Sequence, residues 1–276
     1  MITTQVEQIS PTLAFAYLKT NKNNRNVREM VVDAYAREML AGNWVLQHQG
    51  IAFNENGDLV DGQHRLRAII KSGCTVVMTV TRGLPVNCVT GIDVGAKRHF
   101  QDVLQMQYAD TVEKELRNTR VVSAVRNLIK HNVNSKINMT PTEVRAVFFE
   151  FHDVFSVIDK ITNGNRVGLS GEVTGAIASA LIAGESVENI QAYSRVFKNA
   201  DVSDCENLNV AAAINWRRQI DDAKNERKTI SRVSLFYGTE NSVWNFCHNT
   251  DVKTIKIPKA LRYDIREKCV KTIQQV

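Results

Sequence analysis

The sequence has no long hydrophobic run and no export signal. No apolar stretch approaches the roughly 20 residues that a helix needs to cross a bilayer. The N-terminal stretch MITTQVEQIS lacks both the basic start and the apolar core of a secretory signal peptide. These absences predict a cytoplasmic protein without a membrane partner.

Cysteine is also scarce, and its spacing argues against the usual cysteine-based sites. The five cysteines are odd in number and widely separated, whereas tetrahedral metal sites and redox dithiols use close pairs. Cys247 is followed directly by His248, but one such pair without further ligands is a weak signal for a metal. We therefore expect ordinary reduced thiols at Cys74, Cys88, Cys205, Cys247 and Cys269.

Internal repeats and low-complexity linkers are absent too, so the composition is that of an ordered globular protein. The 276 residues are 43% hydrophobic, which is enough for one large core or two smaller ones. The formal net charge of +6 permits an anionic partner, because lysine and arginine gain affinity by releasing counterions from phosphates. Charge alone does not identify that partner, which has to be argued from a site.

The first part of the chain reads as mixed α/β. A helix is predicted over residues 27–41, and Gly42 stands at the usual position of a helix C-terminus. A short strand at residues 51–53, a turn at 54–57 and a second strand at 58–60 predict a hairpin. The apolar residues expected on one face of the helix are Val31, Tyr35, Met39 and Leu40.

The hydrophobic period changes abruptly after the hairpin. Gly62 supplies a tight turn, and apolar residues then recur at helical spacing until Ser72 and Gly73 end the element. A β-branched run at residues 75–80 predicts a buried strand. The apolar residues of the helix are Leu66, Ile69 and Ile70.

The second part of the chain reads as long amphipathic helices with short connectors. Thr140, Pro141 and Glu143 form a helix-start signal, and Ser186 precedes another helix. The expected fold is therefore an α/β N-terminal domain over residues 1–105, followed by a mostly α-helical domain over residues 106–276.

The segment LVDGQHRLRAII, from Leu59 to Ile70, combines a strand, a glycine turn and a helix start. This order of elements directs free backbone N–H groups and the positive end of the helix dipole at one point, which attracts phosphate. Positive charge early in a helix opposes the dipole unless an anion is bound, and local conflicts of this kind are typical of functional sites. The cationic side chains here are His64, Arg65, Arg67 and Lys71.

A simpler interpretation of the same residues stays open. An Asp-Gly pair after a strand is a common turn, in which Asp61 caps the helix and the arginines form a solvated face. In the functional interpretation, Asp61 holds a metal ion at the end of the strand instead. The carboxylate of Asp61 would thus accept backbone N–H groups in the first interpretation and coordinate a metal ion in the second.

The motif DGQHRLRA, with NNRNVREMVVDAYAREMLAGNW upstream, resembles the ParB/sulfiredoxin superfamily, and within it the DGQHR-type, ParB-like proteins that many bacteriophages encode. The resemblance covers about residues 8–105. It implies a ParB/sulfiredoxin-like fold for the N-terminal domain and a nucleotide bound through its phosphates. If a phage encodes the chain, it also implies the host cytoplasm.

The resemblance also implies site residues. Gly62, His64 and Arg65 correspond to phosphate-contacting positions, and Asp61 to a metal or acid position. Gln63 stands where sulfiredoxins have their reactive cysteine, which argues against sulfinic-acid repair, and where ParB has Glu and the related serine kinases have His. The full candidate set is Asp61 and His64 for catalysis, Asp61 for metal, and Asn24, Arg25, Gly62, Gln63, His64, Arg65 and Arg98 for the nucleotide.

Two of these residues come from outside the motif. Asn24 and Arg25 occupy the place of the Asn-x-Arg element of ParB-like proteins. Arg98 belongs to a second basic cluster that follows a glycine, from Gly91 to Leu104. This cluster either lines one groove together with the DGQHR turn or begins another capped helix with a solvated basic turn. Glu29 and Glu38 are candidates for the acidic base of the kinase relatives, but ordinary surface glutamates are the favoured interpretation for both.

Three functions follow from this reading. The first is a Mg-dependent NTP hydrolase or phosphotransferase, which takes ATP or another nucleoside triphosphate and acts in phage or bacterial DNA metabolism. The second is a non-catalytic DNA-binding protein or nucleotide-controlled switch. A nuclease ranks last, because no cluster of carboxylates is evident that would hold two metals. DNA contact through Trp216 and the basic residues after it, and formation of an oligomer, stay open as partner hypotheses.

Overall fold

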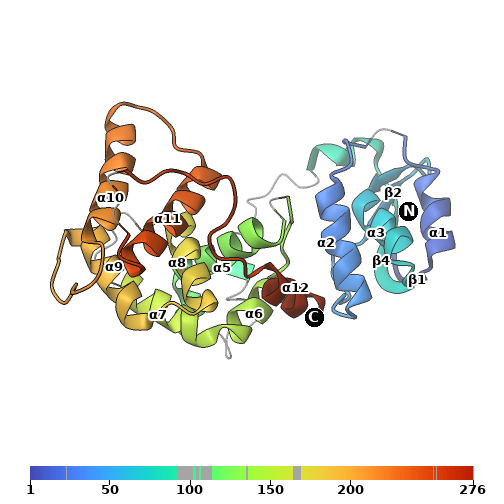
Figure 1. Cartoon of the computed structure of the whole chain (residues 1–276). Helices are drawn as coiled ribbons and strands as arrows, with labels where there is room; N and C mark the ends of the chain where they lie inside the picture. The colour runs from blue at the N-terminus through green and yellow to red at the C-terminus, as the bar shows by residue number, and fades with distance from the viewer. Residues whose placement is uncertain are drawn as a thin grey trace. The chain divides into compact units, whose positions relative to one another are not determined.

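The computed structural model describes residues 1–22, 24–91, 102–103, 106, 114–134, 136–163, 169–250, 252 and 254–275. The chain is mixed α/β and divides into two compact units (Figure 1). The first unit is Met1–Lys97 with Lys136–Thr140, and the second is Arg98–Ser135 with Pro141–Val276. The short segment at residues 136–140 thus packs with the first unit, although the sequence analysis placed one boundary at residue 105 and assigned everything beyond it to the helical domain.

The first unit is built on a four-stranded sheet in the order β1-β4-β2-β3. β4 is antiparallel to β1 and parallel to β2, and β2 is antiparallel to β3. The predicted hairpin between β2 and β3 is confirmed, because the side-chain Oδ1 of Asn54 accepts the backbone N–H groups of Asn56 and Asp58 and so closes the turn. The strands are β1 (Thr3–Ile9), β2 (Ile51–Asn54), β3 (Leu59–Asp61) and β4 (Val76–Leu84).

Three helices complete the first unit: α1 (Pro11–Leu18), α2 (Glu29–Leu40) and α3 (Gln63–Ser72). Helix α3 packs against both α1 and α2. β1 and α1 were not predicted. β1 lies at the edge of the sheet and is mostly exposed, so it lacks an alternating hydrophobic pattern, and α1 is short and almost uniformly apolar. A 3₁₀ segment, η1 (Val86–Gly91), follows β4.

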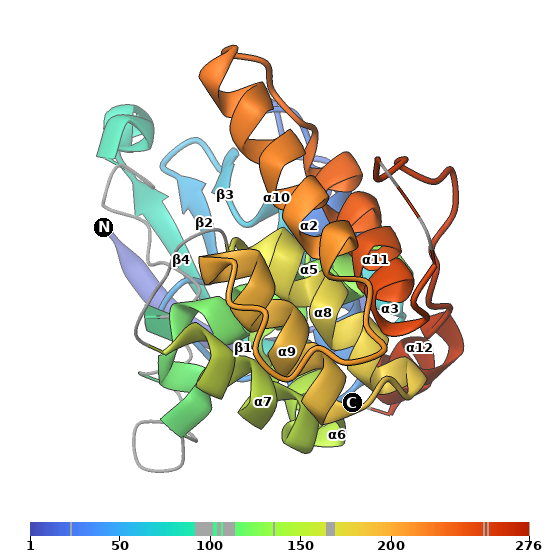
Figure 2. The ribbon, with the colours of Figure 1, turned by 60° about the vertical axis from the view of Figure 1, so that its left-hand side comes forward.

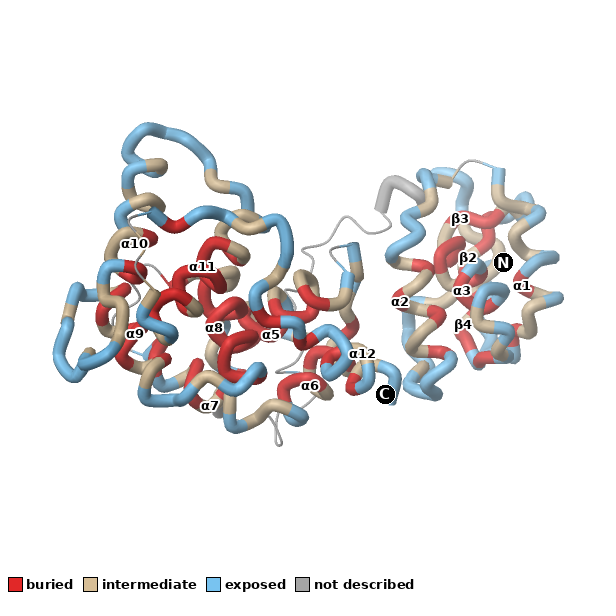
Figure 3. The backbone as a smooth tube through the Cα atoms, viewed as in Figure 1, coloured by how far each residue is buried: buried red, intermediate tan, exposed pale blue. Residues whose placement is uncertain are grey.

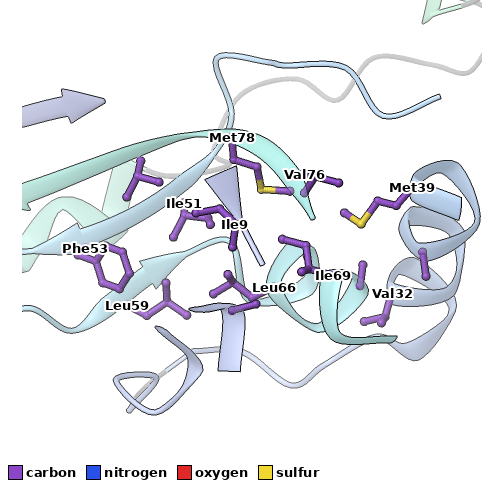
Figure 4. Close-up of a cluster of buried hydrophobic side chains, with 14 residues drawn as sticks. Ile9, Val32, Met39, Ile51, Phe53, Leu59, Leu66, Ile69, Val76 and Met78 are labelled. Carbon is purple, nitrogen blue, oxygen red and sulfur yellow. The ribbon is translucent and has the colours of Figure 1, made fainter. Parts of the chain in front are cut away.

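The core of the first unit lies between the sheet and the helices (Figure 4). Met39 lies on the buried face of α2 and Tyr35 packs against the core, as predicted. Val32 and Ala36 complete that face in place of Val31, and Leu40 is 65% exposed at the helix end. Ile70 is 38% exposed, because α3 turns Leu66 and Ile69 toward the core. The strand predicted at 75–80 is present as part of β4, with Val77 facing outward.

All the regular elements in the described part of the second unit are helical. Helix α8 is buried along nearly its whole length and contacts α5, α7, α9 and α11, as Figures 2 and 3 show. Its alanines permit this close packing. The helices are η2 (Lys114–Arg117), α5 (Thr119–Asn132), α6 (Pro141–Glu150), α7 (His152–Thr162), α8 (Gly171–Ala183), α9 (Val187–Asn199), α10 (Val210–Asn225), α11 (Arg232–Cys247) and α12 (Arg266–Gln274).

No helix in the described ranges is long and apolar enough to pass through a membrane. All five cysteines are free thiols. The helix predicted after Ser186 is confirmed as α9, and the Ser186 hydroxyl caps it by accepting the backbone N–H of Asn189.

Candidate functional site

The turn between β3 and α3 has a backbone conformation that favours glycine. Gly62 has φ 101°, in the left-handed region, and it is the N-cap residue of α3. A Cβ atom at this position would lie 3.1 Å from the Cα of Ile51 and 3.2 Å from the carbonyl oxygen of Gly50. Glycine is therefore required both by the torsion angle and by the approach of β2.

Helix α3 begins without the features that usually satisfy a helix N-terminus. Among the described residues, no side chain accepts a hydrogen bond from its first N–H groups at the cap, and its first turn contains no acidic residue. Free N–H groups and the positive end of the helix dipole therefore remain at this turn. This is the arrangement that binds phosphate at helix N-termini.

Asp61 stands beside the turn but is not the helix cap. Its Oδ1 accepts the backbone N–H of Gly62 at 2.7 Å, and its Oδ2 lies 3.5 Å from Nη1 of Arg65. The cap position itself belongs to Gly62. Asp61 therefore orders the turn and orients Arg65, and its partly exposed carboxylate remains accessible to a cation.

Arg65 extends from α3 back toward the segment before β2. Its Nη1 donates to the carbonyl oxygen of Gly50 at 2.9 Å, and its Nη2 lies 3.3 Å from Oε1 of Gln49. These contacts, together with Asp61, hold the guanidinium close to the turn. A guanidinium has five N–H donors, so the group is oriented in advance and retains donors for an anion.

Gln63 and His64 connect the start of α3 to the segment that leads into α2. Both side chains are buried, at 5% and 7% exposure. Nε2 of Gln63 donates to the carbonyl oxygen of Arg25 at 2.7 Å. Nε2 of His64 accepts the backbone N–H of Arg28 at 3.0 Å, so this nitrogen carries no proton and the ring is neutral. Both residues thus hold the loop before α2 against the turn.

The structure also brings Asn24 and Arg25 to this turn. The side-chain amide of Asn24 donates to the carbonyl oxygen of Leu59, the first residue of β3, at 2.8 Å. The carbonyl of Arg25 is the one that Gln63 binds, and the Arg25 side chain is exposed. The two residues therefore lie beside the motif although nearly 40 positions separate them from it in sequence.

The positive charges of four arginines lie close enough to His64 to lower its pKa. Burial lowers the pKa of His64 first, and the charges of Arg25, Arg28, Arg65 and Arg67 lower it further. Arg28 was not among the predicted site residues, although its position three residues after Arg25, in the first turn of the helix predicted over residues 27–41, could have pointed to it. The turn is therefore strongly electropositive.

The structure does not add the other predicted positions to the turn. Arg98 and its neighbours Asp93, Lys97 and His99 fall outside the described residues. Trp216 is only 1% exposed and its indole N–H donates to Thr239, so it has no ring face for a nucleic-acid base. The described part of the chain holds no cluster of three or more His, Cys, Asp or Glu side chains suited to a metal ion.

No protein-family model, curated protein or solved structure matches the chain. The resemblance to the ParB/sulfiredoxin superfamily therefore stays a prediction, and the argument for function depends on the geometry of the turn.

Proposed function

We propose that this protein binds the phosphate groups of a nucleoside triphosphate, such as ATP, at the turn formed by residues 61–65. The observation that supports the proposal most directly is the uncapped N-terminus of α3 among four arginines. A cation near a helix N-terminus is unfavourable by roughly 0.3–1 kcal/mol. A bound anion interacts favourably with both the arginines and the helix dipole, and it accepts hydrogen bonds from the free N–H groups as well.

We infer further that the nucleotide is hydrolysed, or its phosphoryl group transferred, with Mg²⁺ in phage or bacterial DNA metabolism. Asp61 is the residue that would hold the metal, because its carboxylate is partly exposed at the end of β3 beside Arg65. Mg²⁺ typically takes one or two protein carboxylates and completes its shell with phosphate oxygens and water. Bound there, it would supply charge neutralisation, while the protein's own residues position the phosphates.

His64 has a different role in this proposal from the catalytic, phosphate-contacting role expected from the sequence. Its Nε2 already accepts the N–H of Arg28, so the neutral ring positions the loop before α2. The same contact supports a second candidate function, a nucleotide-controlled switch that regulates DNA binding. An anion at the turn would lie where Gln63 and His64 join α3 to that loop, and it would thereby bias the position of the loop.

The test is a thermal-shift panel of nucleotides with and without Mg²⁺, on the wild type and three alanine variants. Arg65→Ala and Arg28→Ala each remove one guanidinium from the turn, whereas Lys22→Ala removes an exposed cation that pairs with Asp58. We expect a triphosphate to raise the Tm of the wild type and of Lys22→Ala. Losing a charged hydrogen bond costs about 1.5–3 kcal/mol, so the shift should largely vanish in Arg65→Ala.

Each variant is compared with its own nucleotide-free form, because Arg65 also donates to Gly50 and its loss lowers the baseline Tm. Arg28 is exposed, so its replacement leaves the fold intact and tests the same charge cluster independently. Shifts of equal size in all four proteins would place the nucleotide elsewhere.

A further inference from the structure

A hollow of about 450 Å³ lies where α1, α2 and α3 meet on the first unit. Its lining includes four apolar side chains, of which Phe15 is 57% exposed and Ile70 is 38% exposed. Large apolar side chains that remain exposed around a concave surface are a common feature of binding sites. The apolar set is Phe15, Leu18, Val32 and Ile70.

The dimensions of the hollow limit its occupant. Each helix contributes about one turn to the lining: residues 15–19 of α1, 29–32 of α2 and 67–71 of α3. One helical turn rises only about 5.4 Å. A partner helix uses anchors at i, i+3, i+4 and i+7, which extend over roughly twice that length. The hollow therefore suits a compact molecule, and its volume is within the range of small-molecule sites.

The charges around the hollow favour an anion. Lys19, Arg67 and Lys71 line it together with one acidic residue, Glu29. Lys71 is paired with Asp33, and the Lys19 ammonium lies 5.1 Å from the centre of the Phe15 ring. Arg67 is exposed, and no hydrogen bond or ion pair of its side chain is found in the described part of the chain. A guanidinium beside an apolar surface is a suitable partner for a carboxylate, sulfonate or phosphate group.

We propose that this hollow binds an organic anion with a ring-sized apolar body, whose acidic group pairs with the guanidinium of Arg67. The ring would lie against Phe15 and Ile70, in contact with Leu18 and Val32. The apolar walls of this site come from the sides of α1, α2 and α3 and not from the N-terminus of α3, so the site is additional to the phosphate turn. Arg67 contributes to both, because its charge also acts on His64 at the turn.

The probe is 8-anilinonaphthalene-1-sulfonate, an aromatic anion whose fluorescence rises in apolar sites, titrated against the full chain. Two variants address the hollow: Arg67→Glu reverses the charge, and Ile70→Asp places a charge on the apolar wall. Their matched controls are Lys22→Glu, an exposed cation outside the lining, and Met30→Asp, an exposed apolar residue of α2 outside the lining. Thermal melting checks that all four variants fold.

We expect one dye per chain, an affinity at least about tenfold weaker in both hollow variants, and a change below about twofold in both controls. Tenfold corresponds to about 1.4 kcal/mol. Naphthalene-1-sulfonate should displace the dye, whereas 1-naphthylmethylammonium, with the same ring and the opposite charge, should not. The proposal would be overturned if the dye did not bind, or if the hollow and control variants lost equal affinity. Equal displacement of the dye by both competitors would also overturn it.

Discussion

At the scale of single residues, the polar side chains of the turn have structural partners within the protein. Gln63 and His64 bind backbone groups of the loop before α2, and Arg65 binds the carbonyl of Gly50. Such contacts orient a site before a ligand arrives, which lowers the entropic cost of binding. They also mean that replacing these residues changes stability as well as binding.

A substitution at Asp61 distinguishes the two candidate functions, an enzyme and a nucleotide-controlled switch. Asp61→Asn keeps an oxygen that can accept the Gly62 N–H, but it removes the charge beside Arg65. We therefore expect the fold and nucleotide binding to survive, while Mg-dependent turnover collapses because a charged ligand is lost. The measurement is phosphate release by both proteins, with single-stranded and double-stranded DNA each tested as activator or acceptor. Equal turnover in the two proteins would mean that Asp61 has only a structural role. No turnover in the wild type would favour the switch.

Glu240 makes the stability of the protein depend on pH. The residue is fully buried on α11, and one of its oxygens accepts the backbone N–H of Arg262. Burial raises the pKa of Glu240 to about 7, because the charged form is poorly solvated there. The folded protein thus binds this proton more tightly than the unfolded chain does.

The stabilisation from a raised carboxyl pKa is complete below pH 4.5 and is lost as the pH rises toward 7. Glu240→Gln keeps the shape without the titration, so it should unfold at higher urea than the wild type at pH 8. The expected difference is about 3 kcal/mol, and it should nearly disappear at pH 4.5. The same difference between the two proteins at both pH values would show that Glu240 does not titrate in this range.

At the scale of secondary-structure elements, the start of α3 depends on one glycine. Gly62→Ala places a Cβ in a left-handed conformation and against Ile51, whereas Gly57→Ala has the same torsional cost in open space. A left-handed conformation costs about 1–2 kcal/mol without glycine. We expect urea unfolding to show a larger loss for Gly62→Ala than for Gly57→Ala, together with weaker nucleotide binding. Equal losses would mean that the contact with β2 is easily relieved.

The elements differ in how well local sequence predicts them. The hairpin and α3 were predicted because Asn54, Gly57, Gly62 and Gly73 mark their turns directly. β1 was not predicted because Thr3–Ile9 pairs with β4 about 75 residues later, and its exposed edge position needs no apolar pattern. The predicted face of α2 was correct at Met39 but missed Val32, because burial on α2 depends on its packing against α3 and not on the sequence of α2 alone.

At the scale of the whole molecule, the two units have separate cores. Leu66 is fully buried in the first unit and Phe155 in the second. Truncating either side chain to alanine should cost about 2–5 kcal/mol, because a cavity replaces a large apolar group. Calorimetry of the full chain should show two transitions, with Leu66→Ala lowering one and Phe155→Ala lowering the other. A single transition that both variants lower would show that the units unfold together.

The sequence by itself determined the local chemistry of this protein: a glycine turn that opens a basic helix, a hairpin before it and a helical second part. Only the tertiary structure decided which of these groups stay accessible. His64 was expected to grip phosphate, but a backbone N–H 36 residues away occupies its Nε2. DNA contact at Trp216 was an open hypothesis from the sequence, and the structure buries this side chain against α11. Turn residues act on their neighbours through steric effects and so can be predicted locally, whereas hydrogen-bond partners and burial come from segments that the fold brings together.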